Sequence, residues 1–225
     1  MNATVVYVHG LWLSGHEAFM LRRRLEKDRG YEWQAFGYAS TLLTMAEIAD
    51  ALHEAISAID TPTVHLVGHS LGGLAILRCL ERHPQQPPGR VVFLGTPCLT
   101  SRTANAVARF RFGRAILGQA ATEELLYTHE RVWRPGRDLG IIAGNQSFSL
   151  GRLVADFAEA NDGTVAVSET RLPGATAHIV LPVSHSGMLL SARVAHEAGQ
   201  FLELGHFGAA PAPASAPPPG SAPPP

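Results

Sequence analysis

Short apolar runs alternate along the chain with segments of helical periodicity. Runs rich in β-branched residues predict strands over 4–8, 64–67, 90–94, 140–144 and 177–181, and alternation predicts another over 31–38. Between them, apolar residues recur every three or four positions over 16–28, 44–59, 74–82 and 187–204, as in amphipathic helices. Thr44 and Glu47 form a predicted capping box at the start of one helix. This order predicts an α/β protein with a parallel sheet, helices on both faces and right-handed crossovers.

Two regions depart from this alternation. Over residues 100–136, arginines interleave with apolar residues, which predicts one or two amphipathic helices inserted between strands. Two interpretations stay open for them: a cap over an active site, or ordinary surface helices whose arginine stems cover apolar neighbours. Residues 209–225 contain only Ala, Pro, Gly and Ser. We therefore expect one domain over 1–208 and a disordered tail after it.

Composition narrows the class of protein. A chain of 225 residues, 46% hydrophobic and 16% charged, suits a single globular domain. The net charge of −1 gives no field that would attract nucleic acid or anionic membranes. Two cysteines make neither a disulfide framework nor a metal cluster, and we expect Cys79 to be a packed, reduced thiol. No signal peptide or membrane-spanning segment is evident, so we expect a cytoplasmic protein.

The hexapeptide GHSLGG at 68–73 lies between a predicted strand and a predicted helix. A strand, a Gly-x-Ser-x-Gly turn and a helix are the context of a nucleophile elbow, in which Gly68 and Gly72 avoid side-chain clashes. A glycine-rich turn of this kind could instead bind phosphate, but the Lys-Ser/Thr of a P-loop is missing. The pattern therefore predicts that Ser70 is a nucleophile.

A serine nucleophile needs a general base, and eleven histidines are available. In this architecture the base follows a late strand, and His185 lies in the loop after the last one. His178 falls within a strand and His196 within a helix, where packing or solvent-facing roles are expected. His69 lies on the elbow itself, and we expect its side chain to point away from the serine hydroxyl. His9 ends the first strand and is expected to shape the next loop by hydrogen bonding.

The base in turn needs a carboxylate to orient it. Asp156 and Asp162 both follow the strand at 140–144, whereas Asp138 precedes that strand and would lie at the wrong edge of the sheet. Asp162 belongs to an Asn-Asp-Gly turn, which could fix a carboxylate at a loop tip or could be only turn chemistry. We choose Asp162, with Asp156 as the alternative.

Two backbone N–H groups should stabilise the oxyanion. One is expected from Leu71, directly after the nucleophile, and the other from Leu11 in the loop after the first strand. Gly10 allows that loop to approach closely.

These motifs together resemble the α/β-hydrolase superfamily, in particular lipase- and esterase-like members related to the PGAP1-like and bacterial triacylglycerol lipase groups. The resemblance covers residues 4 to about 204 and rests on HGLW at 9–12, GHSLGG at 68–73, LGTP at 94–97, NDG at 161–163 and SH at 184–185. It implies an α/β-hydrolase fold. The chain departs from the family in two ways: Cys98 stands where a histidine is often found, and the chain begins at the family's third strand, which implies a minimal sheet.

We therefore expect a serine hydrolase that cleaves carboxylic esters through an acyl-enzyme, with Ser70, Asp162 and His185 as the triad. No metal or organic cofactor is expected, and the partner is a small-molecule or lipid ester. Trp12 and residues 100–136 are expected to shape an apolar acyl pocket. A thioesterase, an amidase or an acyltransferase would use the same triad, and a non-catalytic ligand-sensing module is the alternative from another class.

Overall fold

The computed structural model describes residues 2–99, 101–109, 113–126, 131–147 and 159–208. Its centre is a six-stranded sheet in the order β2-β1-β3-β4-β5-β6, in which every neighbouring pair of strands is parallel. The strands are β1 (Ala3–Val8), β2 (Glu32–Phe36), β3 (Thr63–His69), β4 (Val91–Leu94), β5 (Leu139–Gly144) and β6 (Ala177–Leu181). All six strands expected from the sequence are confirmed.

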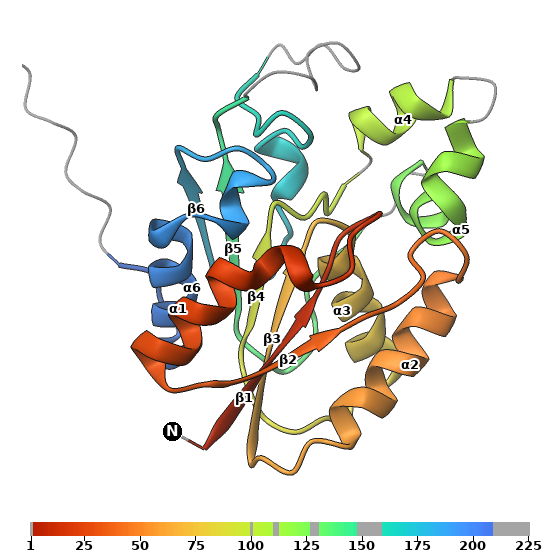
Figure 1. Cartoon of the computed structure of the whole chain (residues 1–225). Helices are drawn as coiled ribbons and strands as arrows, with labels where there is room; N and C mark the ends of the chain where they lie inside the picture. The colour runs from red at the N-terminus through yellow and green to blue at the C-terminus, as the bar shows by residue number, and fades with distance from the viewer. Residues whose placement is uncertain (1, 100, 110–112, 127–130, 148–158, 209–225) are drawn as a thin grey trace, which may run out of the picture.

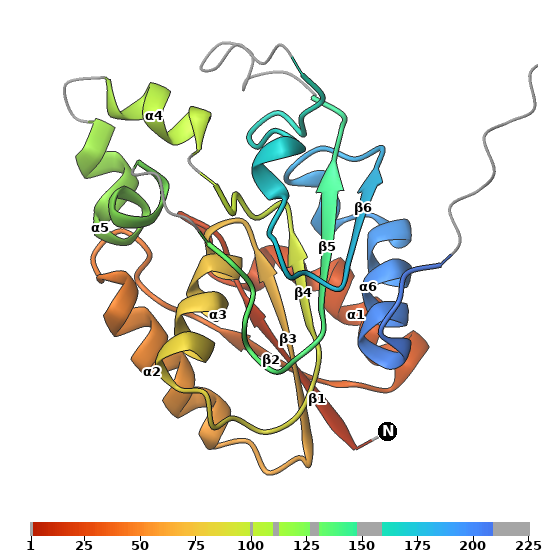
Figure 2. The ribbon, with the colours of Figure 1, turned by 180° about the vertical axis from the view of Figure 1, so that it is seen from behind.

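Helices cover both faces of the sheet. On one face lie α1 (Phe19–Arg29) and α6 (Ala192–Leu204), and on the other lie α2 (Met45–Ser57) and α3 (Leu71–Arg82) (Figures 1 and 2). The predicted capping box of Thr44 and Glu47 starts α2. The pattern over 187–204 divides into a 3-10 turn, η4 (Gly187–Leu189), and α6, because the Ser191 side chain accepts the Val194 N–H and begins a new helix.

The strands divide their side chains between two hydrophobic cores. On β1, Val6 and Val8 face the core beneath α2 and α3, whereas Val5 and Tyr7 face the core beneath α1 and α6. This alternation follows from the two-residue period of a strand. Because both faces of the central strands are buried, these strands are nearly continuous apolar runs in the sequence.

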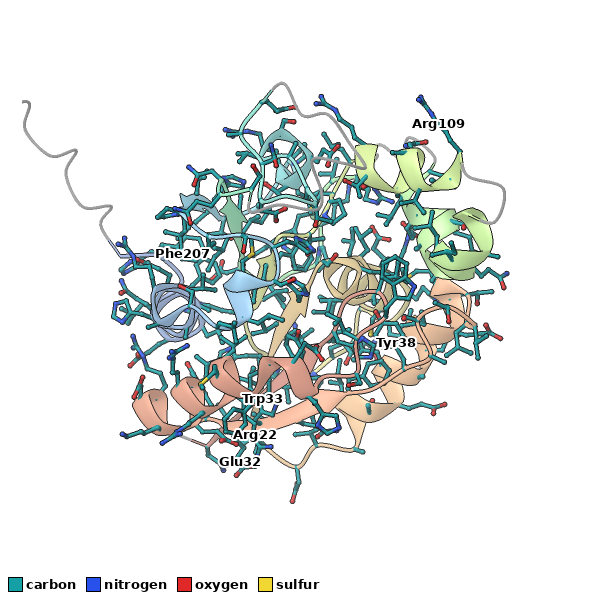
Figure 3. The ribbon with its side chains drawn as sticks, turned by 45° about the horizontal axis from the view of Figure 1, so that its top comes forward. Arg22, Glu32, Trp33, Tyr38, Arg109 and Phe207 are labelled. Atoms are coloured by element: carbon teal, nitrogen blue, oxygen red, sulfur yellow. The ribbon has the colours of Figure 1, made fainter. Side chains whose placement is uncertain are left out.

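Two helices, α4 (Arg102–Ala108) and α5 (Gly113–Leu125), lie together beyond the carboxyl ends of the central strands, on the side of α2 (Figure 1). The helices expected over 100–136 are thus present. The backbone of α5 is non-helical at Gly118, where φ is 76°. Arg109, which follows α4, is exposed and points away from the body of the protein (Figure 3).

Both cysteines are free and buried, as expected for Cys79, and burial raises the pKa of each thiol to about 12. Among the residues that the structure describes, no helix has the length and apolar character needed to cross a membrane. The expected tail over 209–225 lies outside the described residues.

Candidate active site

Ser70 occupies a sharp turn between β3 and α3. Its φ of 54° and ψ of −122° are a conformation that residues with a side chain rarely adopt. Two hydrogen bonds hold the turn: Ser70 N–H donates to the Leu94 carbonyl at 2.9 Å, and Gly73 N–H donates to the Ser70 carbonyl at 3.1 Å. The local geometry is therefore that of a strand-turn-helix elbow.

Glycines around Ser70 permit close packing of backbone. A Cβ at Gly72 would lie 2.1 Å from the Val8 carbonyl oxygen, and one at Gly68 would lie 2.6 Å from the Gly73 Cα. These contacts confirm the prediction that Gly68 and Gly72 avoid clashes. Gly73 is equally constrained, because a Cβ there would lie 2.1 Å from Thr96 Oγ1.

Asp162 and His185 form a hydrogen-bonded pair after β5 and β6, with Asp162 buried and His185 partly buried. His185 Nδ1 lies 2.7 Å from Asp162 Oδ2, and the His185 N–H donates to the Asp162 carbonyl at 2.9 Å. Asp162 is only 2% exposed, and its Oδ1 accepts the N–H groups of Thr164 and Val165 at 2.9 and 2.7 Å. Since an ionised carboxylate only accepts hydrogen bonds, it favours the proton on His185 Nδ1 and leaves Nε2 as the proton acceptor.

Gly95, directly after β4, lies against this pair. Its φ is +56°, and a Cβ there would lie 3.0 Å from His185 Nδ1 and 3.1 Å from Asp162 Oδ2. The turn after β4 therefore brings the backbone so close to the pair that a side chain would press on both partners.

Ser70 and His185 line the same cavity, which has a volume of about 300 Å³. Among the hydrogen bonds of the described residues, none joins Ser70 Oγ to the His185 ring; catalytic hydrogen bonds are often long before substrate binds. The remaining walls are mainly apolar. The loop after β1, α4 and α5 supply Leu11, Ala104, Val107, Leu117 and Leu125, and Pro97 and Val165 come from the turn after β4 and from the loop that follows Asp162.

His9 shapes the loop after β1, as expected. Its Nε2 accepts the Tyr38 N–H at 3.2 Å, so the proton is on Nδ1, which donates to the Gly10 carbonyl at 2.8 Å. The Tyr38 hydroxyl donates to the His9 carbonyl, and the two rings stack with centroids 4.2 Å apart. Burial lowers the pKa of His9, so the ring stays neutral and this loop keeps its shape near neutral pH.

The two residues expected to supply the oxyanion donors, Leu11 and Leu71, line the same cavity as Ser70. Leu71 is the first residue of α3. Leu11 follows Gly10, where an added Cβ would lie 3.1 Å from Ser70 Cβ. Within the described part of the chain, neither the Leu11 nor the Leu71 N–H has an acceptor. Both groups are therefore available to a substrate oxygen.

His69 has a role that the sequence analysis missed. Its Nε2 donates to the His185 carbonyl at 3.1 Å, and the two rings lie 4.7 Å apart. Burial, together with the nearby His185, lowers the pKa of His69 to about 3, so it adds no charge beside the base. Only its position next to Ser70 could have indicated this, because the partner is 116 residues away in the chain.

The structure does not bring the other candidates to this cavity. His178 hydrogen-bonds the Thr170 hydroxyl at 2.8 Å, and His196 is exposed on α6. Asp138 pairs with Arg90 before β5, at the opposite edge of the sheet. Asp156 lies outside the described residues. No group of three or more His, Cys, Asp or Glu side chains in the described ranges could hold a metal ion.

Comparisons with solved structures find proteins of the same fold. Lipase BlEst2 from Bacillus licheniformis, in its mature form, has a TM-score of 0.72 and 22% identity, with 91% of this chain and 92% of that chain covered. A metagenomic carboxyl esterase has a TM-score of 0.64 and 20% identity over 82% of this chain and 64% of that one. The type II thioesterase BorB from the borrelidin biosynthetic cluster has a TM-score of 0.58 and 16% identity, over 90% and 92%. At these identities the similarity shows the fold alone.

A search of curated proteins by sequence finds no match. The model of the alpha/beta hydrolase family, in contrast, matches residues 5–222, nearly the whole length. The six-stranded parallel sheet covered on both faces agrees with that match. The chain belongs to the alpha/beta hydrolase family.

Proposed function

We propose that this chain is a serine hydrolase that cleaves carboxylic esters through an acyl-enzyme. The observation that carries the proposal is that Ser70, on its elbow, and His185, paired with the buried Asp162, line one cavity. Each feature alone has a structural explanation. Together they supply a nucleophile, a base and a carboxylate that orients the base.

In the proposed reaction, His185 Nε2 takes the Ser70 proton as the hydroxyl oxygen attacks the ester carbonyl. The Asp162 carboxylate keeps the imidazole oriented and stabilises its positive charge. His185 then protonates the leaving alcohol, and a water molecule activated by the same histidine releases the acid. The N–H groups of Leu11 and Leu71 donate to the oxyanion of each tetrahedral intermediate, and one such donor contributes about 3 kcal/mol to transition-state stabilisation.

The cavity supports a small aliphatic acyl group as the substrate. Its volume of about 300 Å³ accommodates on the order of ten non-hydrogen atoms, at roughly 30 Å³ each, the share of a water molecule in the liquid. Ala104 and Val107 of α4 and Leu117 of α5 line it, which favours a chain of methylene groups over a charged one. We therefore propose that α4 and α5 form a cap that bounds the acyl site.

Thioester cleavage is the second candidate reaction. The same residues would perform it, and the thioesterase BorB has the same fold. The two reactions separate experimentally, because an oxygen ester and a thioester of the same acyl group can be compared at one chain length.

The test is the hydrolysis of p-nitrophenyl esters from acetate to palmitate, with fluorophosphonate labelling of the serine alongside. We expect Ser70→Ala, Asp162→Asn and His185→Ala each to lower turnover by several orders of magnitude. The matched controls, which change the same residue types far from the cavity, are Ser57→Ala, Asp138→Asn and His196→Ala. If Asp162→Asn alone keeps its turnover, the acid is another residue and Asp156 is tested next. If the wild type cleaves no ester or thioester and does not react with the fluorophosphonate, the proposal of a serine hydrolase is refuted. The alternative, a non-catalytic ligand-sensing module, is then favoured.

A further inference from the structure

Glu169 is a buried acidic residue that the proposed reaction does not use. It lies in a 3-10 turn, η3 (Ser168–Thr170), and is 4% exposed. Its Oε1 accepts the Arg102 N–H at 2.9 Å, and its Oε2 accepts the Ala166 N–H at 3.2 Å. Burial raises the pKa of Glu169, and these two N–H groups act in the opposite direction. Burial of a carboxyl group is energetically unfavourable, and the Glu169 carboxyl group is buried where it accepts hydrogen bonds from two separate segments.

The first segment carries the proposed catalytic acid. Ala166 follows Val165, whose N–H donates to Asp162 Oδ1, and the Asp162 N–H donates in return to the Val165 carbonyl. The bond from Ala166 to Glu169 therefore holds the end of the turn that fixes the Asp162 carboxylate.

The second segment is the proposed cap. Arg102 is the first residue of α4, the helix that supplies Ala104 and Val107 to the cavity wall. A second hydrogen bond, from the Thr103 hydroxyl to the Thr164 carbonyl, joins the same two segments. Glu169 and Thr103 thus link the wall of the cavity to the loop of Asp162, in addition to the ion pair between the Arg102 and Glu159 side chains.

The geometry points to Glu169 as a positioning residue. Through one carboxylate it holds both the turn that orients Asp162 toward His185 and the start of α4, which lines the cavity. This inference rests on the proposed function. It predicts that loss of Glu169 affects turnover through Asp162, and not merely through the stability of the fold.

Glu159 provides a matched control. Its carboxylate pairs with the Arg102 side chain at 2.8 Å and is partly exposed, whereas Glu169 binds the Arg102 backbone N–H. Among the described residues, Arg102 and Glu159 are the charged groups that act on the Glu169 carboxyl group, whose Oε1 lies 3.8 Å from Arg102 Nε. Glu159→Ala therefore removes a charge of the same sign and its own ion pair with Arg102, but it keeps the hydrogen bonds from Arg102 N–H to Glu169 and from Thr103 to Thr164.

The experiment is a double-mutant cycle on kcat and KM for p-nitrophenyl butyrate, with Glu169→Ala made in the wild type and in Asp162→Asn. We expect Glu169→Ala to lower kcat about tenfold or more in the wild type, since small displacements of a catalytic group are costly, with a smaller change in KM. In Asp162→Asn the same change should cost less than about twofold, because the carboxylate it positions is already gone. Glu169→Gln, which keeps one acceptor oxygen, should restore part of kcat, and Glu159→Ala should keep all of it.

Two results would overturn the inference. In one, Glu169→Ala lowers kcat by the same factor in both backgrounds, which marks a general structural role. In the other, it lowers kcat no more than Glu159→Ala does. A wild-type level of kcat in Asp162→Asn would instead refute the proposed function, because Asp162 would not be the catalytic acid. The positioning role of Glu169 would then be refuted as well. If Glu169→Ala does not fold, Thr103→Val is used to remove the hydrogen bond between Thr103 and Thr164. The factor by which it lowers kcat is then compared between the wild type and Asp162→Asn, and equal factors would overturn the inference.

Discussion

Gly95 offers the sharpest test of the geometry around the proposed acid and base. An alanine there would place a methyl group 3.0 Å from His185 Nδ1 and 3.1 Å from Asp162 Oδ2, on a backbone with φ of +56°. The left-handed backbone costs a residue with a Cβ about 1–2 kcal/mol. The methyl contacts are a few tenths of an ångström too short, so the 2.7 Å hydrogen bond between Asp162 and His185 must shift.

Gly205→Ala is a control that has the cost of the left-handed backbone without the methyl contacts to Asp162 and His185. Gly205 ends α6 with φ of +80°, and the atoms nearest to a Cβ there belong to the ion pair of Arg90 and Asp138, with Arg90 Nε at 3.1 Å and Asp138 Oδ2 at 3.3 Å. Gly205→Ala therefore introduces a similar backbone strain at a distance from the cavity. We expect both variants to lower the free energy of unfolding by about 1–2 kcal/mol, measured from urea denaturation.

Only Gly95→Ala should also affect turnover. A displacement of about 1 Å in a catalytic group costs on the order of a hundredfold, so a shift of a few tenths should lower kcat about tenfold, with KM nearly unchanged. The assay is ester hydrolysis by both variants under conditions where each is fully folded. Equal kcat in the two variants would refute the reasoning, because the pair would then tolerate displacement or take no part in catalysis.

Further predictions concern stability and the size of the acyl site. Burial, with smaller effects of Arg90 and Arg137, lowers the pKa of His65 to about 4, so stability is complete above pH 6.5 and falls by roughly 3 kcal/mol by pH 4. His65→Gln should reduce that pH dependence of the urea midpoint, and an unchanged slope would contradict it. Arg131→Met should destabilise the fold by about 1–3 kcal/mol in the same assay, because its hydrogen bonds to the buried Glu124 carboxylate and to the Cys98 carbonyl are lost while Glu124 keeps its ion pair with Arg78. Ala104→Trp should fill the cavity and move the best substrate to a shorter acyl chain, and an unmoved optimum would place the acyl group elsewhere.

The fold could be predicted from the sequence because its determinants are local. Each central strand is buried on both faces, so it appears as a short apolar run with no competing helical period. The elbow could be predicted for a similar reason, since the glycines at 68 and 72 are required by contacts within one turn and with the neighbouring strand. The pairing of Asp162 with His185 depended on chain order, which a parallel sheet converts into proximity at one edge.

The residues that sequence reasoning missed act through partners far along the chain. His69 binds the His185 carbonyl, and Glu169 binds the Arg102 N–H, 67 residues away. Neither has a distinctive neighbourhood in the sequence, because a buried polar side chain is identified by its partner and not by its flanking residues. Such contacts become visible only when the loops at the carboxyl edge have been placed together.

Cys98 lies outside the cavity in which the proposed substrate would bind. Family members often carry a histidine there, but the Cys98 side chain is fully buried, does not line the cavity, and directs its Sγ to the Thr96 carbonyl at 3.6 Å. Its own carbonyl accepts a hydrogen bond from Arg131, which also binds the Glu124 carbonyl and carboxylate near the end of α5. This turn therefore holds α5 in place and offers no side chain to a substrate. Since Ala104, Val107, Leu117 and Leu125 of α4 and α5 line the cavity and Cys98 does not, we expect selectivity in the proposed reaction to change with substitutions in those helices and to survive Cys98→Ser.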